Sequence, residues 1–487
     1  MGVLVAGAGP AGLALACGLR QHGTAVRVVD RAAGPATTSR ANILHARGVE
    51  VLNRLGALGD LRERSVAAMR LTMHLDGSPV ATIRFGEVEG AQLSALLVSQ
   101  AEIEAELRRR LAELGVEVEW DSAVVDAVQD ADGVTATLST GETVRTGWLA
   151  GCDGAHSRVR ELAGIGFPGV PLADQWLLAD VHADWDRDRS GSAGWLHRDG
   201  LFVAMPMREP GGRDDLWRLM CDVPLSGNRL GDGEIVDRMR RLLVERTGQA
   251  GVRIRDAKWV SSFRIHRRLA ETYRNGRVLL AGDAAHIHSP FGGQGMNTGI
   301  GDAENLAWKL ALVVDGTASP ALLDTYEAER RPLAEEVLRG TTFNTKVLLG
   351  GGAVTRFARD RVLTPLLKLP AVQRAGTNIA SQLLVSYRRG PLGSGRGPRP
   401  RPGDRVRDFE CLRDGARTRL HTELRGHWAV VGHASAELLG EHVVALEPTG
   451  SGDVLLVRPD GHLAWRGRNP ADLERWLRSA LTAGITR

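Results

Sequence analysis

Three glycines near the N-terminus, Gly7, Gly9 and Gly12, have the spacing G-x-G-x-x-G that is typical of loops binding a dinucleotide pyrophosphate. The first permits a tight turn, the second lets the backbone approach the phosphates, and the third lets a helix pack closely on the preceding strand. The apolar run 3–6 predicts that strand, and residues 13–20 predict the helix. Its free N–H groups and positive dipole end would face the phosphates. The context predicts a dinucleotide site, for FAD or NAD, rather than an ordinary glycine-rich turn.

An acidic residue follows the next predicted strand. Asp30 ends the strand 26–29, about 20 residues past the glycines, where a carboxylate would accept hydrogen bonds from an adenosine ribose. Further on, Arg47 lies on a predicted helix over 45–55. Because a guanidinium is a planar phosphate clamp, Arg47 could pair with the same pyrophosphate. The alternative for Arg47 is a solvated position on the helix surface.

Two further strands also run into an acid and glycines. One ends at Asp153-Gly154, followed by a helix that Ser157 would cap, and this suits a second dinucleotide contact. The other ends at Asp283, where a glycine-rich loop opens a predicted helix over 300–314. The N-terminus of that helix would favour an isoalloxazine, whose reduced form carries negative charge. His286 and His288 in this loop have no third ligand nearby, so they do not indicate a metal site.

The composition narrows the class of protein. A chain of 487 residues predicts two to four domains, and no apolar stretch approaches the roughly 18 residues of a membrane span. We expect a cytoplasmic protein with no membrane partner. Four scattered cysteines without a C-x-x-C motif indicate neither a disulfide framework nor a zinc site. The net charge of +4 is spread along the chain without a basic block, so we expect no nucleic-acid partner.

The rest of the chain divides by pattern. Residues 170–265 predict a separate β-rich region with a helix at 233–248, rich in tryptophan, that could wall a large apolar ligand. The alternative is that these tryptophans form an ordinary sheet core. Residues 321–389 are predicted to be mostly helical, and a glycine- and proline-rich stretch then leads into a small α/β domain.

Three signatures together carry a family resemblance: GAGPAG at 7–12, GCDGAHSRVR at 151–160 and AGDAAH…PFGGQGMNTG at 281–299. They resemble those of the class A FAD-dependent aromatic hydroxylases, the para-hydroxybenzoate and phenol hydroxylase group. Within this group the chain is most similar to the enzymes that hydroxylate aromatic polyketides. The tail resembles their C-terminal thioredoxin-like domain, but it lacks C-x-x-C, so no thiol redox chemistry is expected there.

The resemblance implies an α/β fold in which a Rossmann-like FAD-binding domain carries an inserted β-sheet substrate domain. The boundaries that we predict are a discontinuous FAD-binding domain of residues 1–70, 97–169 and 267–345, a substrate domain of residues 71–96 and 170–266, a helical segment 346–390, a linker 391–405 and a thioredoxin-like domain 406–487.

The resemblance also implies roles for individual residues. Pyrophosphate, ribose, ribityl and isoalloxazine contacts with FAD are expected from Gly7, Gly9, Pro10, Ala11, Gly12, Asp30, Arg31, Arg40, Arg47, Gln100, Asp153, Asp283, Pro290, Gly293, Gly295, Met296 and Asn297. We predict substrate contacts from Trp195, Phe202, Met205, Trp217 and Met220. No catalytic residue is predicted, because an electron-rich phenolate does not require a protein base, and no metal is expected.

The implied function is a monooxygenase in which NADPH or NADH reduces FAD and O₂ then forms a flavin C4a-hydroperoxide that hydroxylates an aromatic ring. The partner is an aromatic small molecule, and the protein is a monomer or a homodimer. Baeyer–Villiger insertion and epoxidation remain alternatives that only the product separates. An FAD-dependent dehydrogenase or reductase that makes no oxygenated product, and a flavin-binding regulator without turnover, remain open as well.

Overall fold

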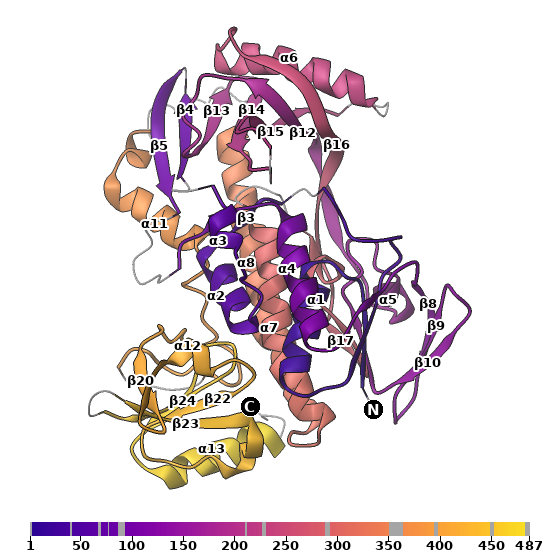
Figure 1. Ribbon diagram of the computed structural model, residues 1–487, viewed down its shortest axis with the longest axis vertical. Helices are drawn as coiled ribbons and strands as arrows, with labels where there is room; N and C mark the ends of the chain where they lie inside the picture. The colour runs from indigo at the N-terminus through magenta and orange to yellow at the C-terminus, as the bar shows by residue number, and fades with distance from the viewer. Residues whose placement is uncertain are drawn as a thin grey trace.

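The computed structural model describes residues 2–38, 41–66, 70–75, 77–85, 93–209, 212–225, 230–287, 293–349, 364–393, 398–448 and 452–482. The predicted sites Arg40 and Pro290, and the predicted His288, lie outside these residues. Within them, no helix has the length and apolar character needed to cross a membrane. The chain forms a mixed α/β fold (Figure 1).

A mostly parallel sheet forms the first layer. Its strands, in spatial order, are β17 (Arg274–Asn275), β18 (Val278–Leu280), β11 (Trp148–Gly151), β1 (Val3–Ala6), β2 (Val26–Val29) and β7 (Val118–Glu119). Strand β1 pairs in parallel with β2 on one side and β11 on the other. All four residues of β1 are buried, as expected for a central strand covered on both faces. The predicted strands at 3–6, 26–29 and before Asp153 are confirmed.

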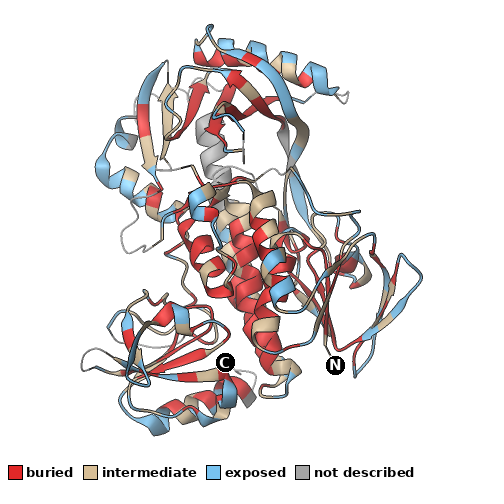
Figure 2. Cartoon of the chain, in the orientation of Figure 1, coloured by how far each residue is buried: buried red, intermediate tan, exposed pale blue. Residues whose placement is uncertain are grey.

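Helices pack on this sheet and on one another, and Figure 2 shows the central helices to be mostly buried. They are α1 (Pro10–Gln21), α2 (Ala46–Leu55), α3 (Leu61–Arg64), α4 (Gln100–Glu113), α5 (Arg158–Leu162), α7 (Gln294–Val314) and α8 (Asp324–Leu349). Helices α1 and α7 cross closely at Gly18, since this residue has no side chain. A Cβ atom there would lie only 2.6 Å from Cβ of Ala307. A hairpin sheet of β8 (Val124–Gln129), β9 (Val134–Leu138) and β10 (Thr143–Thr146) lies at the side.

An eight-stranded sheet forms the β-rich region that the sequence predicted. Its strands, in spatial order, are β19 (His286–Ile287), β16 (Arg253–Leu269), β12 (Gly169–Asp184), β15 (Leu216–Pro224), β14 (Gly200–Pro206), β13 (Ser192–His197), β4 (Arg70–Leu75) and β5 (Ser78–Arg84). The helix predicted at 233–248 is α6 (Asp232–Thr247), which covers one face of this sheet (Figure 1). Strands β3 (Ile43–Leu44) and β6 (Leu96–Leu97) pair with each other where the sheet meets the parallel-sheet unit.

The C-terminal part has its own six-stranded sheet. Its spatial order is β21 (Ala416–Arg419), β20 (Glu410–Arg413), β23 (Val443–Pro448), β22 (Trp428–Val431), β24 (Val454–Val457) and β25 (Leu463–Gly467). Helices α12 (Leu420–Glu423) and α13 (Pro470–Thr482) accompany it, and α10 (Thr364–Leu367) and α11 (Pro370–Ala380) precede it. From the predicted linker, Arg405 forms a buried ion pair with Glu50 of α2.

Candidate functional site

The glycine loop lies between β1 and α1 with the geometry that the motif predicts. Gly7 has φ +105°, and a Cβ atom there would lie 2.3 Å from the Cys152 carbonyl oxygen. A Cβ atom on Gly12 would lie 1.9 Å from the Gly7 carbonyl oxygen, which explains why the helix requires glycine at this position. Around Gly9 there is no atom within 4 Å of such a Cβ, and no side chain caps α1. The loop therefore presents open backbone and an uncapped helix N-terminus, which together suit an anionic pyrophosphate.

Asp30 follows β2 and holds the loop from the side. Its Oδ2 accepts a hydrogen bond of 2.6 Å from the Ala8 N–H, and its Oδ1 accepts one of 2.8 Å from the Ala32 N–H. Arg31 next to it is exposed, and Gln100 at the start of α4 donates to Glu104 at 2.8 Å. The structure thus places Asp30 beside the loop, where the predicted ribose contact would be made.

The third motif, which contains Asp283, lies next to the N-terminal glycine motif in the folded chain. Asp283 lies in the short turn η1 (Gly282–Ala284), directly after β18, and is exposed. A Cβ atom on Gly282 would lie 2.9 Å from Cβ of Ala11, and one on Gly299 would lie 3.2 Å from Cα of Gly282. The starts of α1 and α7 therefore converge at η1, although they are separated by almost 300 positions in the chain.

Asn297 and Asp153, which the resemblance assigned to FAD, make contacts within the protein. The Asn297 side chain is buried, accepts from the His45 N–H at 2.8 Å, and donates to the Ile43 carbonyl at 2.9 Å. Asp153 accepts from the Ser157 hydroxyl at 2.5 Å and from the Val159 N–H at 3.1 Å, so it stabilises the start of α5. Both residues shape the loops of the site, and their predicted cofactor contacts stay predictions.

Arg47 lies on the predicted helix, but its side chain is neither a pyrophosphate clamp nor solvated, the two roles that the sequence analysis considered. Its guanidinium is buried and donates to Glu304 at 3.0 Å, to Glu50 at 3.3 Å and to the Asp460 carbonyl at 2.6 Å. These partners come from α7, α2 and the C-terminal part. We therefore withdraw Arg47 as a pyrophosphate clamp, because its donors are taken up by Glu50, Glu304 and the Asp460 carbonyl.

A buried polar group that the sequence analysis missed supports the third motif. Asp302 on α7 accepts from the Gly282 N–H at 3.2 Å and is paired with His286 at 2.6 Å and Arg330 at 2.7 Å. Burial acts to raise the pKa of Asp302, but His286 and Arg330 outweigh it and lower that pKa. The carboxylate is therefore ionised and holds η1. The sequence signal that could have identified Asp302 is an acidic residue three positions after Gly299, inside an otherwise apolar helix.

One face of the eight-stranded sheet, which we call the inner face, is directed at the parallel-sheet unit. The Asn42 side chain reaches across and lies 3.5 Å from the sulfur of Met205. The inner face is largely apolar. Its buried apolar side chains are Trp176, Leu178, Leu196, Leu201, Met205 and Met220.

The opposite face, which we call the outer face, is packed under α6. Trp195, Phe202 and Trp217 belong to it and are at most 3% exposed, among the α6 side chains Ile235, Met239 and Leu243. Their predicted substrate contact is therefore wrong, because side chains alternate along a strand and these three point away from the inner face. Met205 and Met220 lie on the inner face, and their predicted role stays a prediction.

A buried ion pair interrupts the apolar inner face. Arg218 donates to Asp180 through Nε and Nη2, both at 2.8 Å, and the two residues face each other across β15 and β12. Arg218 is fully buried, with its guanidinium 5.8 Å from the centre of the Trp259 ring. Such a pair is costly to bury, so its presence is weak evidence for stability.

The glycine loop, the uncapped α1 and the supported turn η1 define a dinucleotide-binding protein with one such site in the described residues. Residues 1–341 match the protein family described as FAD binding domain. A 6-methylpretetramide 4-monooxygenase of Streptomyces rimosus is 38% identical over 404 residues, which cover 81% of this chain and 71% of that protein. A dialkyldecalin synthase of Streptomyces rugosporus is 32% identical over 489 residues, covering 98% of each chain. The solved structure of an anhydrotetracycline hydroxylase, OxyS, from Streptomyces rimosus matches with a TM-score of 0.80 and 33% identity over 98% of both chains.

The chain belongs to the FAD binding domain family. The predicted resemblance to the FAD-dependent aromatic hydroxylases is confirmed, and so are the FAD cofactor and the class of enzyme. The open backbone at Gly9 and the close contacts at Gly7 and Gly12 fit an FAD pyrophosphate.

Two glycine variants separate the fold from cofactor binding. We expect Gly9→Ala to fold normally, because its Cβ meets nothing within 4 Å, and to lose about tenfold or more in FAD affinity. We expect Gly12→Ala to lower the free energy of unfolding by about 1–3 kcal/mol or more, because its Cβ meets the Gly7 carbonyl. Flavin fluorescence titration and urea unfolding measure the two effects. Equal FAD affinity in Gly9→Ala and the wild type would contradict the assignment of the loop.

Proposed function

We propose that this enzyme hydroxylates a polycyclic aromatic polyketide, using FAD, NADPH or NADH and O₂. The observation that carries the substrate class is the apolar inner face opposite the flavin-binding unit, with the Asp180–Arg218 pair set into it. Extended apolar walls with a few fixed polar groups are typical of sites for flat, hydrophobic ligands. The names of the two hydroxylating relatives given above specify 6-methylpretetramide and anhydrotetracycline, which supports this class.

The residues of the chain would divide the work as follows. Gly7, Gly9 and Gly12 would hold the FAD pyrophosphate, and Asp283 and the start of α7 would lie toward the flavin ring system. Bound FAD supplies the redox and oxygen chemistry. Met205 and Met220 would exclude water and contact the substrate rings. We further propose that the protein acts in the cytoplasm as a monomer or homodimer, with the domain boundaries predicted above.

Product analysis tests this proposal. We expect the FAD-loaded enzyme, supplied with NADPH under air, to convert a tetracyclic phenol of the pretetramide type into a product containing one additional oxygen atom. Labelled ¹⁸O₂ should enter that product, because the oxygen comes from O₂. Protein stripped of FAD is the matched control and should form no product.

The relative named as a dialkyldecalin synthase makes one further outcome informative. A product of unchanged mass, formed without consuming NADPH, would overturn the oxygenase proposal in favour of a cyclisation. Consumption of NADPH without any oxygenated product across tetracyclic phenols would instead favour the dehydrogenase alternative. Oxygen placed in a ring-expanded ester or an epoxide would retain the monooxygenase and change the reaction type.

A further inference from the structure

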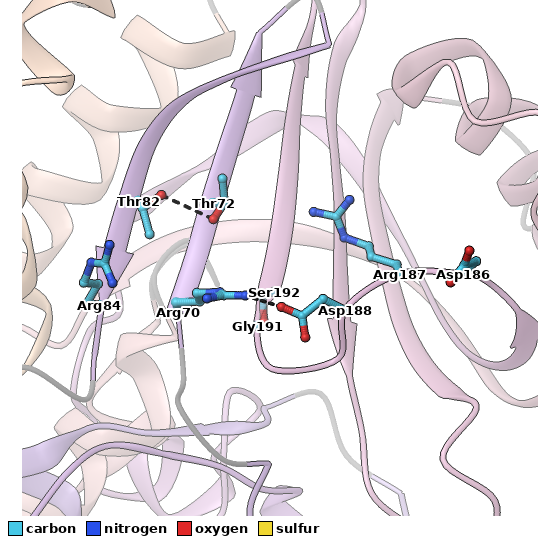
Figure 3. A pocket seen from close by; sticks show the side chains of 9 residues that line it. All are labelled: Arg70, Thr72, Thr82, Arg84, Asp186, Arg187, Asp188, Gly191 and Ser192. Carbon is cyan, nitrogen blue, oxygen red and sulfur yellow. Dashed lines mark hydrogen bonds and ion pairs between the residues drawn. The ribbon is translucent and has the colours of Figure 1, made fainter.

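A pocket of about 430 Å³ opens on the eight-stranded sheet, at the edge formed by β13, β4, β5 and the loop 185–191 (Figure 3). Three arginines, two threonines, a serine, a glycine and two aspartates line it. None of these residues belongs to the candidate flavin site. Ser192 lines the pocket at the start of β13, but its side chain points to the inner face, as Gly194 does.

The pocket lies on the outer face of the sheet. Thr72 of β4 and Thr82 of β5 are direct partners across the two strands, with their hydroxyl oxygens 3.3 Å apart. His74, two residues beyond Thr72 and so on the same face, stacks on Trp195 with ring centres 5.4 Å apart. Trp195 is part of the core under α6. The sheet therefore separates this pocket from the inner face and from the proposed aromatic substrate.

Arg187 provides a cation without a carboxylate partner in the part of the chain that the structure describes. It is half-buried, and among the described residues no carboxylate forms an ion pair with its guanidinium, which instead lies 5.0 Å from the centre of the Trp195 ring. Burial, opposed by the nearby Asp188, lowers the pKa of Arg187. Figure 3 shows its guanidinium extending toward the strands that carry Thr72 and Thr82. A partly desolvated guanidinium of this kind gains most from an anionic ligand.

The second element of the site is an arginine held in place. Arg70 is paired with Asp188, whose carboxylate also accepts from the Ser190 N–H at 2.8 Å and the Ser190 hydroxyl at 2.6 Å. The loop can approach Arg70 because residue 191 is glycine, where a Cβ atom would lie 2.4 Å from Cγ of Arg70. The pairing neutralises Asp188, and Asp186 is exposed on the side of the loop away from Arg70 and Thr72 (Figure 3). The pocket therefore keeps a net positive charge.

We propose that this pocket binds the phosphate group of a phosphorylated small molecule, with the guanidiniums of Arg187 and Arg70 and the hydroxyls of Thr72 and Thr82 as donors. Donors on several sides suit the tetrahedral oxygens of a phosphate, and planar guanidiniums bind two of these oxygens at once. The volume exceeds that of one phosphate, so a second phosphate or an organic group also fits. Free pyrophosphate and the 2′-phosphate of NADPH are two sources of this chemistry; only the second rests on the proposed function.

Calorimetric titration of the FAD-loaded protein tests the site without turnover. The probes are inorganic pyrophosphate, 2′-phospho-ADP-ribose and ADP-ribose, and the fluorescence of Trp195 provides a second signal because Arg187 lies over its ring. We expect saturable binding of at least one of the two probes with a terminal phosphate, weakened at least about tenfold in Arg187→Gln and measurably weakened in Thr72→Val. Arg198→Gln is the matched control, since Arg198 has 75% of its side chain exposed and pairs only with Asp199 in the described residues.

The outcomes separate the sources. Preference for 2′-phospho-ADP-ribose over both other probes would assign the site to the nicotinamide donor, and equal binding of pyrophosphate would assign it to free phosphates. No saturable binding of any probe at millimolar concentration, or binding that Arg187→Gln leaves unchanged, would overturn the proposal. Unchanged flavin absorbance and unfolding midpoint in the variants would show that they are folded. A failed hydroxylation assay has no bearing on this result.

Discussion

Replacing Arg458 by methionine is expected to lower the free energy of unfolding by about 3–5 kcal/mol, because it leaves carboxylates buried without their cation. Arg458 is fully buried and binds both oxygens of Glu329, at 2.7 and 2.9 Å, and both oxygens of Asp460, at 3.1 and 2.5 Å. Burial acts to raise the pKa of Glu329, but Arg458 and Lys309 outweigh it and lower that pKa to about 2. Without Arg458, that compensation is largely lost.

Urea unfolding of the FAD-loaded enzyme measures this effect. The matched control is Arg475→Met on α13, whose side chain is 77% exposed and pairs with Asp472, so its loss should cost less than about 1 kcal/mol. Because the ion pair between Arg458 and Glu329 joins the C-terminal part to α8, we expect the C-terminal part to unfold first in Arg458→Met. An unfolding midpoint equal to that of Arg475→Met would contradict the importance of the buried ion pairs that Arg458 forms with Glu329 and Asp460.

Two adjacent residues of α8, Glu329 and Arg330, connect the buried ion pairs of Arg458 to the candidate flavin site. Glu329 is directed at Arg458 of the C-terminal part, whereas Arg330 donates to Asp302, which accepts from the Gly282 N–H. Arg330 also donates to the Tyr387 hydroxyl at 3.0 Å. The C-terminal part is thus attached to the helix that supports the turn η1. With no C-x-x-C, its contribution visible here is packing and charge pairing rather than thiol chemistry.

The glycine motif and the strands could be predicted from the sequence because the contacts that require these residues are made with near neighbours. Gly7, Gly9 and Gly12 are required by contacts within a few residues and with the adjacent strand, so their spacing was sufficient. The strand before each acid was equally clear, since a buried parallel strand is a short apolar run. Helix α7 begins six residues earlier than predicted, because glycines at its start suggested loop where the backbone is already helical.

The errors came from contacts between distant segments. The direction of Arg47 depends on Asp460, more than 400 residues away, and no local pattern shows that pairing. Trp217 was chosen for its residue type, although alternation along β15 already separates Trp217, Leu219 and Cys221 from Arg218 and Met220. Which of the two sets faces the parallel-sheet unit depends on the face of the sheet that α6 covers, and the sequence alone does not show this.

Acidification is expected to destabilise the contact between α2, α7, α8 and the C-terminal part between pH 6.5 and about 4, because buried histidines there resist protonation. Burial raises the pKa of Glu304 in the same contact, and this shift acts in the opposite direction and reduces the slope. Burial, opposed mainly by Asp460, lowers the pKa of His462 from 6.5 to about 4. Burial and the nearby Arg54 also lower the pKa of His421. His462 is enclosed by Asp460, Arg47, Arg458 and the Tyr387 ring, whose centre lies 4.2 Å from that of the imidazole.

The sign follows from proton binding in the two states. Below pH 6.5 the unfolded chain protonates both histidines, while the folded protein keeps them neutral, so the free energy of unfolding falls as the pH falls. Each histidine contributes up to about 1.4 kcal/mol per pH unit, and this loss continues for His462 until the pH reaches its folded pKa. Urea unfolding between pH 7.5 and 4.5 measures the slope. His462→Asn should remove about half of the slope contributed by the pair, whereas the exposed His433→Asn should leave it unchanged. A slope that is the same in His462→Asn and the wild type would show that the acid sensitivity lies elsewhere in the chain.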